Sequence, residues 1–290
     1  MINELSNDAV RIAVNSLGAE LWSLKDQRSG TEHLWQGDPA FWKGRSPILF
    51  PVVGHLEDGV YRDEGREYTL DVHGFAKDRE FRPVGETADT LTYLLESDEA
   101  TLAVYPYRFA LEVRYTLAPA GVRVEITARN RDDRAMYFSV GGHPGFNCPW
   151  EPGASMEDYR LVFERPETLR RRLHDVGILT GETEAFLTAE RVVRLSHGLF
   201  ERGAVMLGGL SSGSVALESA LSAGRIRVEL PGFPYLGIWS PRGEAPFVCI
   251  EPWHGIGPTR GADPEIRTRE GILRLESEEA FTCGYAITIE

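Results

Sequence analysis

The stretch Phe109-Ala-Leu-Glu-Val-Arg-Tyr-Thr-Leu-Ala-Pro-Ala-Gly-Val-Arg-Val-Glu-Ile-Thr-Ala128 decides the fold class. Mostly apolar side chains fill every second position on both sides of the segment Ala118-Pro-Ala-Gly121. A period of two is typical of β-strands that bury one face, and proline and glycine between two such runs favour a turn. The sequence therefore predicts an antiparallel hairpin with one buried face over residues 109–128.

The same alternation recurs along the chain, whereas helical periodicity is almost absent. Further alternating runs occupy residues 10–14, 68–72, 226–230 and 281–289, and only short helical turns are expected near residues 38–42 and 196–202. Many short strands separated by turns predict an all-β sandwich or barrel with few short helices. We find no internal repeat and no flexible linker, so we expect one β domain over residues 1–290.

The charge balance narrows the classes of partner. The 31 Lys and Arg side chains face 44 Asp and Glu, which gives a formal net charge of −13. This balance argues against binding to nucleic acid and to anionic membranes, both of which need clustered basic side chains. The longest apolar stretch, residues 46–54, is too short to span a bilayer. Without a visible secretory signal, and with the widely spaced Cys148, Cys249 and Cys283 expected to be reduced, we predict a cytoplasmic protein.

Two segments place a polar side chain beside unusual backbone. Gly44-Arg-Ser-Pro-Ile-Leu-Phe-Pro51 contains two prolines that keep the chain extended, so Arg45 can be aimed into a cleft. A surface arginine beside a buried strand fits the same pattern. In Asp71-Val-His-Gly-Phe-Ala76, His73 follows a strand pattern, and Gly74 permits a turn or the close approach of a ligand. A hydrogen-bonded structural histidine is the alternative there.

Two further segments carry the candidate acid and base. Val140-Gly-Gly-His-Pro-Gly-Phe-Asn147 crowds small residues around His143, which favours an exposed imidazole as much as a structural turn. In Phe247-Val-Cys-Ile-Glu-Pro-Trp253, Glu251 is expected to end an apolar strand that Pro252 stops. Partial burial there would raise the pKa of the carboxyl and make it a better base near neutral pH. The alternative is an exposed Glu251 above a packed Trp253.

Other histidines and tryptophans carry weaker signals. The histidines without such settings are expected on the surface or in loops, and three tryptophans fit either the core or the wall of a sugar cleft. The histidines are His55, His174 and His254, and the tryptophans are Trp150, Trp239 and Trp253.

If the four segments converge, the site holds an acid, a base, a second imidazole and a fixed cation. We find no motif for an activated nucleophile, a phosphate loop or a dinucleotide fingerprint. The set suits proton transfer on a small polar substrate, and the opening of a cyclic hemiacetal is such a reaction. It requires no cofactor and no metal.

In their order, Arg45-Ser-Pro-Ile-Leu-Phe-Pro, His73-Gly-Phe-Ala, Gly142-His-Pro-Gly-Phe-Asn and Glu251-Pro-Trp resemble the aldose 1-epimerase (galactose mutarotase-like) family, and within it the LacX-like branch. The resemblance implies a large antiparallel β-supersandwich with an open sugar cleft. It also implies that the chain is an isomerase that interconverts the anomers of an aldohexose, with a small-molecule sugar as its partner.

The resemblance assigns roles residue by residue. Glu251 would be the general base on the anomeric hydroxyl, His143 the general acid at the ring oxygen, and His73 an assistant to that acid. Arg45 would hold a sugar hydroxyl. Galactose-type relatives grip the sugar with an aspartate in a middle loop, but the stretch Leu195-Ser-His-Gly-Leu-Phe200 contains none, so His197 is predicted to take its place.

The sequence also permits three other functions. Some relatives act on hexose 6-phosphates, and Lys43, Lys77 and Arg79 lie near motif residues where they could serve a phosphate. A non-catalytic carbohydrate-binding protein would keep the sandwich without needing an acid–base pair. A metal enzyme could use His73, His143 and Glu251 as a facial triad, although the paired histidine ligands of cupin-like barrels are missing.

Overall fold

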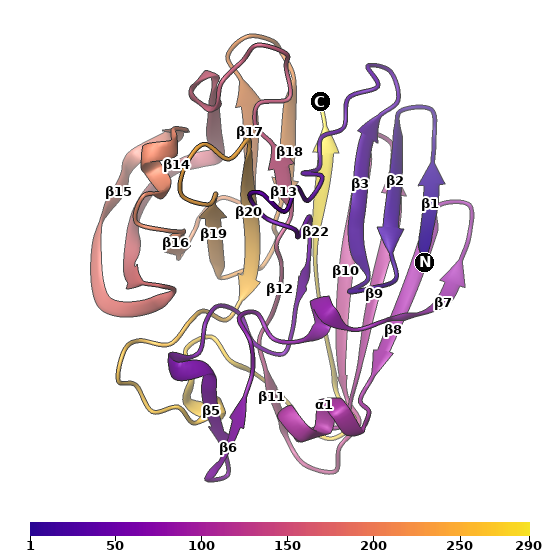
Figure 1. Ribbon diagram of the computed structural model, residues 1–290, viewed down its shortest axis with the longest axis vertical. Coiled ribbons are helices and arrows are strands. Elements are labelled where there is room, and N and C mark those ends of the chain that lie inside the picture. The colour runs from indigo at the N-terminus through magenta and orange to yellow at the C-terminus, as the bar shows by residue number, and fades with distance from the viewer.

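The computed structural model describes residues 1–290 (Figure 1). The strands are β1 (Ile2–Ser6), β2 (Val10–Asn15), β3 (Glu20–Asp26), β4 (Ile48–Leu49), β5 (Val60–Asp63), β6 (Arg66–Thr69), β7 (Arg82–Glu86), β8 (Thr90–Glu96), β9 (Phe109–Ala118), β10 (Gly121–Asn130), β11 (Met136–Phe138), β12 (Val140–Gly142), β13 (Gly145–Asn147), β14 (Tyr159–Asp175), β15 (Ile178–Arg194), β16 (Val205–Gly208), β17 (Ser214–Ser219), β18 (Arg225–Glu229), β19 (Tyr235–Trp239), β20 (Phe247–His254), β21 (Leu273–Leu275) and β22 (Ala280–Ile289). The helices are α1 (Glu99–Val104) and the 3₁₀ turns η1 (Glu57–Gly59), η2 (Ala76–Asp78), η3 (Met156–Asp158), η4 (His197–Phe200) and η5 (Ile266–Thr268).

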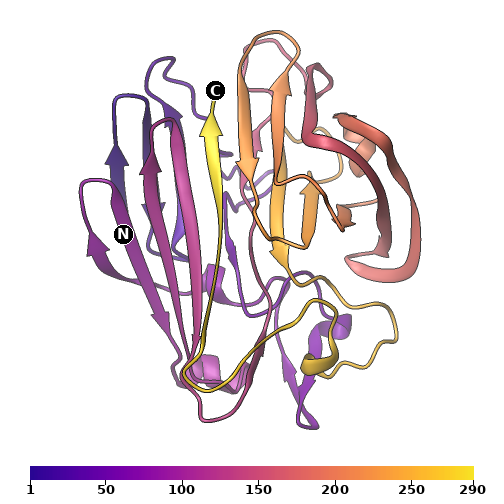
Figure 2. The ribbon, with the colours of Figure 1, turned by 180° about the vertical axis from the view of Figure 1, so that it is seen from behind.

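One antiparallel sheet of 15 strands forms most of the molecule. Its order is β4-β12-β20-β19-β16-β14-β17-β18-β22-β10-β9-β8-β7, with β13 paired to β20 and β15 paired to β14. A three-stranded sheet, β1-β2-β3, lies over the β7–β10 end in Figure 1, and Figure 2 shows the same two layers from behind. The predicted all-β fold, a large antiparallel β-supersandwich, is confirmed.

The hairpin that the opening stretch predicts is present as β9 and β10. Ala118 pairs with Gly121 across the turn, and the alternating side chains of Leu111, Val113 and Tyr115 are fully buried. The runs at residues 10–14, 226–230 and 281–289 are also strands, whereas the run at residues 68–72 stops being a strand after Thr69.

The helical predictions hold only in part. The turn near residues 196–202 is η4, but residues 38–42 form a single turn in which the Trp42 N–H donates to the Asp38 carbonyl at 2.9 Å. The helix α1 was not predicted, because six residues are too few to show helical periodicity. Its signal is the capping box between Asp98 and Thr101. No helix in the structure has both the length and the apolar character needed to cross a bilayer.

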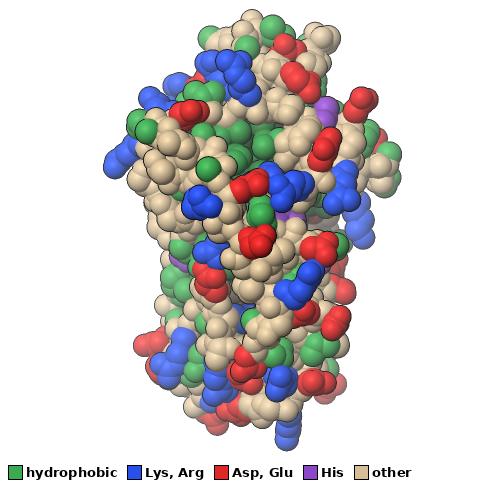
Figure 3. All heavy atoms as spheres, turned by 90° about the vertical axis from the view of Figure 1, so that its left-hand side faces the viewer, with side chains coloured by type: hydrophobic (Ala, Val, Ile, Leu, Met, Phe, Trp, Pro, Cys, Tyr) green, Lys and Arg blue, Asp and Glu red, His purple; other side chains and the backbone are tan.

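The interior is apolar and extensive. One cluster of 62 buried residues reaches from Leu5 to Ile289. The cysteines Cys148, Cys249 and Cys283 are all buried and unpaired, as predicted for reduced thiols. On the face that carries the β14–β15 hairpin, acidic and basic side chains are interspersed rather than gathered by sign (Figure 3).

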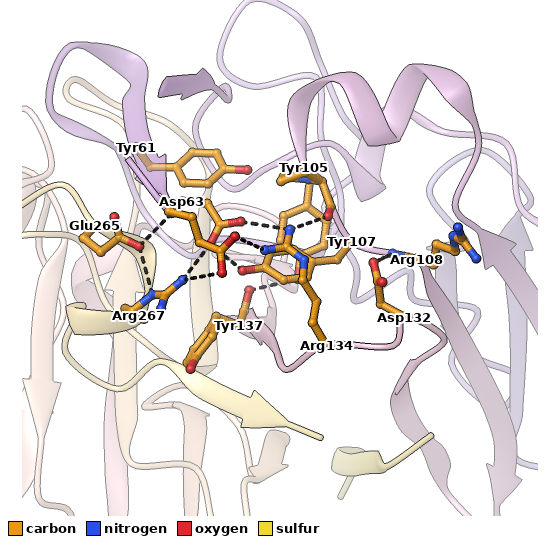
Figure 4. Close-up of polar contacts among 12 residues, drawn as sticks. Tyr61, Asp63, Tyr105, Tyr107, Arg108, Asp132, Arg134, Tyr137, Glu265 and Arg267 are labelled. Carbon is orange, nitrogen blue, oxygen red and sulfur yellow. Dashed lines mark hydrogen bonds and ion pairs between the residues drawn. The ribbon is translucent and has the colours of Figure 1, made fainter. Parts of the chain in front are cut away.

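A buried polar cluster fastens the β5–β6 hairpin to the rest of the molecule (Figure 4). Asp63, at the end of β5, is 2 % exposed and accepts a hydrogen bond from the Tyr107 hydroxyl at 2.6 Å. Its carboxylate also meets the guanidinium groups of Arg134 at 3.0 Å and Arg267 at 3.4 Å. One carboxylate therefore joins three segments that are far apart in the sequence.

His254, which we expected on the surface or in a loop, lies in β20 between the rings of Phe233 and Phe281, at centroid distances of 4.7 and 4.9 Å. Burial lowers its pKa to about 4. The unfolded chain therefore binds a proton at this site between about pH 6.5 and 4 that the folded chain does not, and stability falls as the pH falls through that window. We expect His254→Phe to make the loss of unfolding free energy shallower there, as measured by urea denaturation. An unchanged slope would contradict this account.

Candidate active site

A cavity of about 590 Å³ collects most of the predicted site residues. Its walls come from β3, the segment 42–55, the segment 72–78, the tip of the β14–β15 hairpin, β16, β19 and β20 (Figure 1). His73, His143 and Glu251 all line it, so the structure brings the predicted acid, base and second imidazole together. A cavity of this size suits a small polar ligand.

His143 lies in the two-residue link between β12 and β13. The glycines before it are required by packing, since a Cβ on Gly142 would come within 2.5 Å of the Tyr285 ring. The His143 N–H donates to the Pro47 carbonyl at 3.1 Å, which ties the link to the segment before β4. The imidazole is enclosed by Trp42 and Trp239, at centroid distances of 4.8 and 5.6 Å.

Glu251 lies within a strand, contrary to the prediction that Pro252 ends it. Strand β20 continues through Pro252 to His254. Proline has no N–H to donate, but the strand tolerates it because Pro252 lies in a gap between two neighbouring strands. Strand β13 pairs with β20 up to Cys249, and β12 pairs with β20 only from Trp253 onward, so no strand needs a hydrogen bond from Pro252. The carboxylate is consequently more deeply buried than the sequence suggested, at 1 % exposed.

The two candidate catalytic groups touch. His143 Nε2 lies 3.1 Å from Glu251 Oε2, and neither carboxylate oxygen has a hydrogen bond of good geometry. Burial raises the pKa of Glu251 well above its usual value and lowers the pKa of His143 to about 3. Both shifts favour the neutral forms, a protonated carboxyl beside a neutral imidazole, so one proton can be passed between Glu251 and His143 Nε2. A buried carboxyl with unmet hydrogen-bonding capacity is costly unless a ligand supplies a partner.

His73 stands against the pair. Its ring is edge-on to that of His143, with centroids 5.3 Å apart. The Gly54 N–H donates to His73 Nδ1 at 3.1 Å, which leaves the proton on Nε2 as a donor. Burial, followed by the neighbouring His143, keeps the pKa of His73 well below its usual value, so the ring is neutral. Gly74 permits this placement, because a Cβ there would lie 2.3 Å from the Phe50 carbonyl oxygen.

Arg45 does not line the cavity, contrary to the prediction. Its guanidinium stacks over the Trp22 ring at 3.8 Å, and Nη1 donates to the Trp22 carbonyl at 2.8 Å and to Gln36 at 2.7 Å. These contacts with Trp22 and Gln36 fix the side chain against the Trp22 ring. Trp22 itself lines the cavity, and nothing in its surroundings in the sequence marked it.

His197 also lies outside the cavity wall. It opens the turn η4 and has one buried ring nitrogen without a partner. His55 lies in a loop, as expected, whereas His174, also expected on the surface or in a loop, lies in β14, and both residues line the cavity. His174 is held by backbone on both sides, since its Nδ1 accepts from the Gly177 N–H at 3.1 Å and its Nε2 lies 2.9 Å from the Ala204 carbonyl. No local motif in the sequence marks either residue. The β14–β15 hairpin, which carries His174, reaches the cavity only because segments far apart in the sequence pack together.

The remaining candidates divide between the wall and its surroundings. Lys43 and Lys77 line the cavity, and Lys77 Nζ is already held by the Gly74 carbonyl and by Asp78, each at 2.7 Å. Arg79 does not line the cavity, but faces the Phe75 ring at 5.9 Å. Four tryptophans belong to the wall, namely Trp22, Trp42, Trp239 and Trp253, whereas Trp150 packs on Tyr159.

One group of side chains has the composition of a metal site. Ligand atoms of His143, Cys249 and Glu251 lie within 4.8 Å of one another, and all three residues are buried. The set differs from the predicted facial triad because Cys249 takes the place of His73. Burial raises the pKa of the Cys249 thiol well above its usual value, so binding of a metal there would require loss of that proton.

Comparison with known proteins identifies the family. The sequence profile described as Aldose 1-epimerase matches residues 1–193. The chromosomal Protein LacX of Lactococcus lactis subsp. lactis is 32 % identical over 298 residues, which cover 100 % of this chain and 99 % of LacX. The chain therefore belongs to the aldose 1-epimerase family, and the predicted resemblance to its LacX-like branch is confirmed.

Solved structures agree along the whole length. A galactose mutarotase related enzyme from Lactobacillus acidophilus is 31 % identical, with a TM-score of 0.96 over 100 % of this chain and 97 % of that one. A galactose mutarotase-like protein from Lactobacillus casei ATCC 334 is 29 % identical, with a TM-score of 0.93 over 100 % of both chains. A putative aldose 1-epimerase from Escherichia coli K12, at 19 % identity and a TM-score of 0.76, shares the fold.

Proposed function

We propose that this protein is an aldose 1-epimerase that interconverts the α and β anomers of an aldohexose by opening and reclosing the ring. The observation that carries the proposal is the contact of 3.1 Å between His143 Nε2 and Glu251 Oε2 inside a sugar-sized cavity. The anomeric oxygen O1 and the ring oxygen O5 are bonded to the same carbon, C1. Two proton-transfer groups in direct contact can therefore reach both oxygens at once.

The reaction leaves the pair with the same number of protons, because the one proton that Glu251 and His143 exchange is returned by the end of the cycle. Proton transfer from Glu251 to His143 yields a carboxylate and an imidazolium, and hydrogen bonds from sugar hydroxyls favour this charged form. The carboxylate removes the O1 proton while the imidazolium protonates O5, and the C1–O5 bond breaks to give an aldehyde. Rotation about C1–C2 turns the other face of the carbonyl toward O5. On reclosure Glu251 returns a proton to O1 and His143 takes the proton from O5.

Two neighbours support this exchange. His73 is neutral, has Nε2 as its donor and lies against the His143 ring, and in this proposal it hydrogen-bonds the ring oxygen region and so assists His143. Arg45 is a positioning residue in this proposal, because it acts through the Trp22 ring that it covers. A pure carbohydrate-binding protein would have no need for a buried acid in contact with an imidazole, so the pair favours catalysis.

The proposal is tested by anomer exchange in the wild-type protein. Magnetisation-transfer NMR on a panel of free aldoses and their 6-phosphates, with a metal chelator present, should show exchange faster than in buffer for at least one sugar. The chelator should not change the rate, because the scheme uses only side-chain protons. Exchange at the buffer rate for every sugar would overturn the proposal, and activity lost on chelation would favour a metal enzyme.

A further inference from the structure

Three carboxylates line the cavity, and only one of them is free to take a ligand hydroxyl outside the catalytic pair. Glu251 belongs to the pair with His143. Asp78 is 61 % exposed and is paired with Lys77 at 2.7 Å. Glu20 remains, and the aspartate that the family resemblance led us to look for in a middle loop has no counterpart in the wall.

Glu20 is a fixed acceptor. It begins β3, and its Oε1 accepts from the backbone N–H groups of Arg45 at 2.7 Å and Ser46 at 2.9 Å. Its Oε2 has no hydrogen-bond partner within the protein and is not buried out of reach, so it is available to a ligand in the cavity. Burial raises the pKa of Glu20 despite these donors.

A flat apolar surface lies beside this acceptor. Trp22 is two residues along β3 from Glu20, and both side chains line the cavity. Arg45 covers one face of the indole at 3.8 Å and holds its backbone carbonyl, which fixes the ring. An aromatic plate next to a carboxylate oxygen matches a sugar, which presents apolar C–H groups on its face and hydroxyl donors at its edge.

We propose that Glu20 and Trp22 form the specificity half of the sugar site, in which Glu20 Oε2 accepts hydrogen bonds from ring hydroxyls other than the anomeric one. This inference rests on the proposed function. One short segment, residues 45–47, connects Glu20 to His143 of the proposed catalytic pair through backbone hydrogen bonds. The N–H groups of Arg45 and Ser46 donate to Glu20, and the next residue, Pro47, accepts from the His143 N–H at 3.1 Å.

The test combines Glu20→Gln with deoxy sugars. The amide keeps an oxygen for the two backbone donors, so the thermal midpoint should stay close to that of the wild type. KM for the best aldose should rise by about 10- to 100-fold, the value of a hydrogen bond to a charged group, while kcat changes far less. For the deoxy sugar that lacks the hydroxyl bound by Glu20, KM should be the same in the wild type and in Glu20→Gln. Glu167→Gln is the matched control, because Glu167 Oε1 also accepts from two backbone N–H groups, those of Ser211 and Ser212, but lies outside the cavity wall, and the KM of this variant should stay close to that of the wild type.

Each outcome decides the inference. An unchanged KM for Glu20→Gln in an active protein, or equal discrimination among all the deoxy sugars by both proteins, would overturn the role of Glu20 and leave the epimerase proposal intact. A wild type that accelerates no aldose would overturn the epimerase proposal itself. If Glu20→Gln does not fold, Glu20→Asp replaces it. That variant keeps the charge but withdraws it by one methylene, and it should also raise KM.

Discussion

Glu251→Gln is expected to lower kcat by roughly two to four orders of magnitude, the usual contribution of general acid–base catalysis, without unfolding the protein. The amide has nearly the shape of the carboxyl group but cannot take the O1 proton. It also cannot exchange a proton with His143 Nε2, which lies 3.1 Å away. Anomer exchange by NMR gives the rate, and circular dichroism checks the fold.

His143→Ala should show a similar loss, because the two groups share one proton. The double variant should then be about as inactive as either single variant, since residues that act as a unit are not additive. Cys249→Ala is the matched control, because Cys249 lies on the same face of β20 and is just as buried but transfers no proton. Near-normal turnover in Glu251→Gln or His143→Ala would refute the assigned roles.

Most strands could be predicted from the sequence, because the pattern that indicates a strand lies within the few residues that form it. In β9, β10 and β22 the burial of every second side chain is set by the pleat, so the alternation is written into the sequence. The β14–β15 hairpin was not predictable in the same way. Its strands of 17 residues pair with four register shifts, and bulges of this kind break the period of two.

The residues to which we assign catalytic roles could be predicted from the sequence, whereas the residues that surround them in the cavity could not. His73 and His143 lie next to glycines that the backbone requires, and this leaves a motif in the sequence. Glu20, His55 and His174 reach the cavity only through the packing of distant segments, and no neighbouring residue marks them. The direction of a side chain is equally invisible, because the sequence around Arg45 does not show whether it faces the cavity or the back of a tryptophan.

The largest effect on stability is expected from Asp63→Ala. The variant removes the carboxylate that joins Tyr107, Arg134 and Arg267 (Figure 4). A buried hydroxyl loses its partner, and the two guanidinium groups lose their buried counterion and share only the exposed Glu64. Breaking a buried ion pair from one side costs about 3–5 kcal/mol, and we expect the lower part of that range because both arginines keep contact with solvent. Urea denaturation of the variant and the wild type measures the difference in unfolding free energy.

Burial, rather than the count of ion pairs, is what this prediction tests. Asp175→Ala breaks a pair with Arg260 at 2.9 Å, a normal ion-pair distance, but its partners are 65 % and 56 % exposed. That loss should be below about 1 kcal/mol, as for other surface pairs. Equal losses in the two variants would show that the Asp63 cluster is solvated in the folded state. Because this cluster lies outside the cavity wall, Asp63→Ala should leave kcat and KM unchanged in the fraction that stays folded.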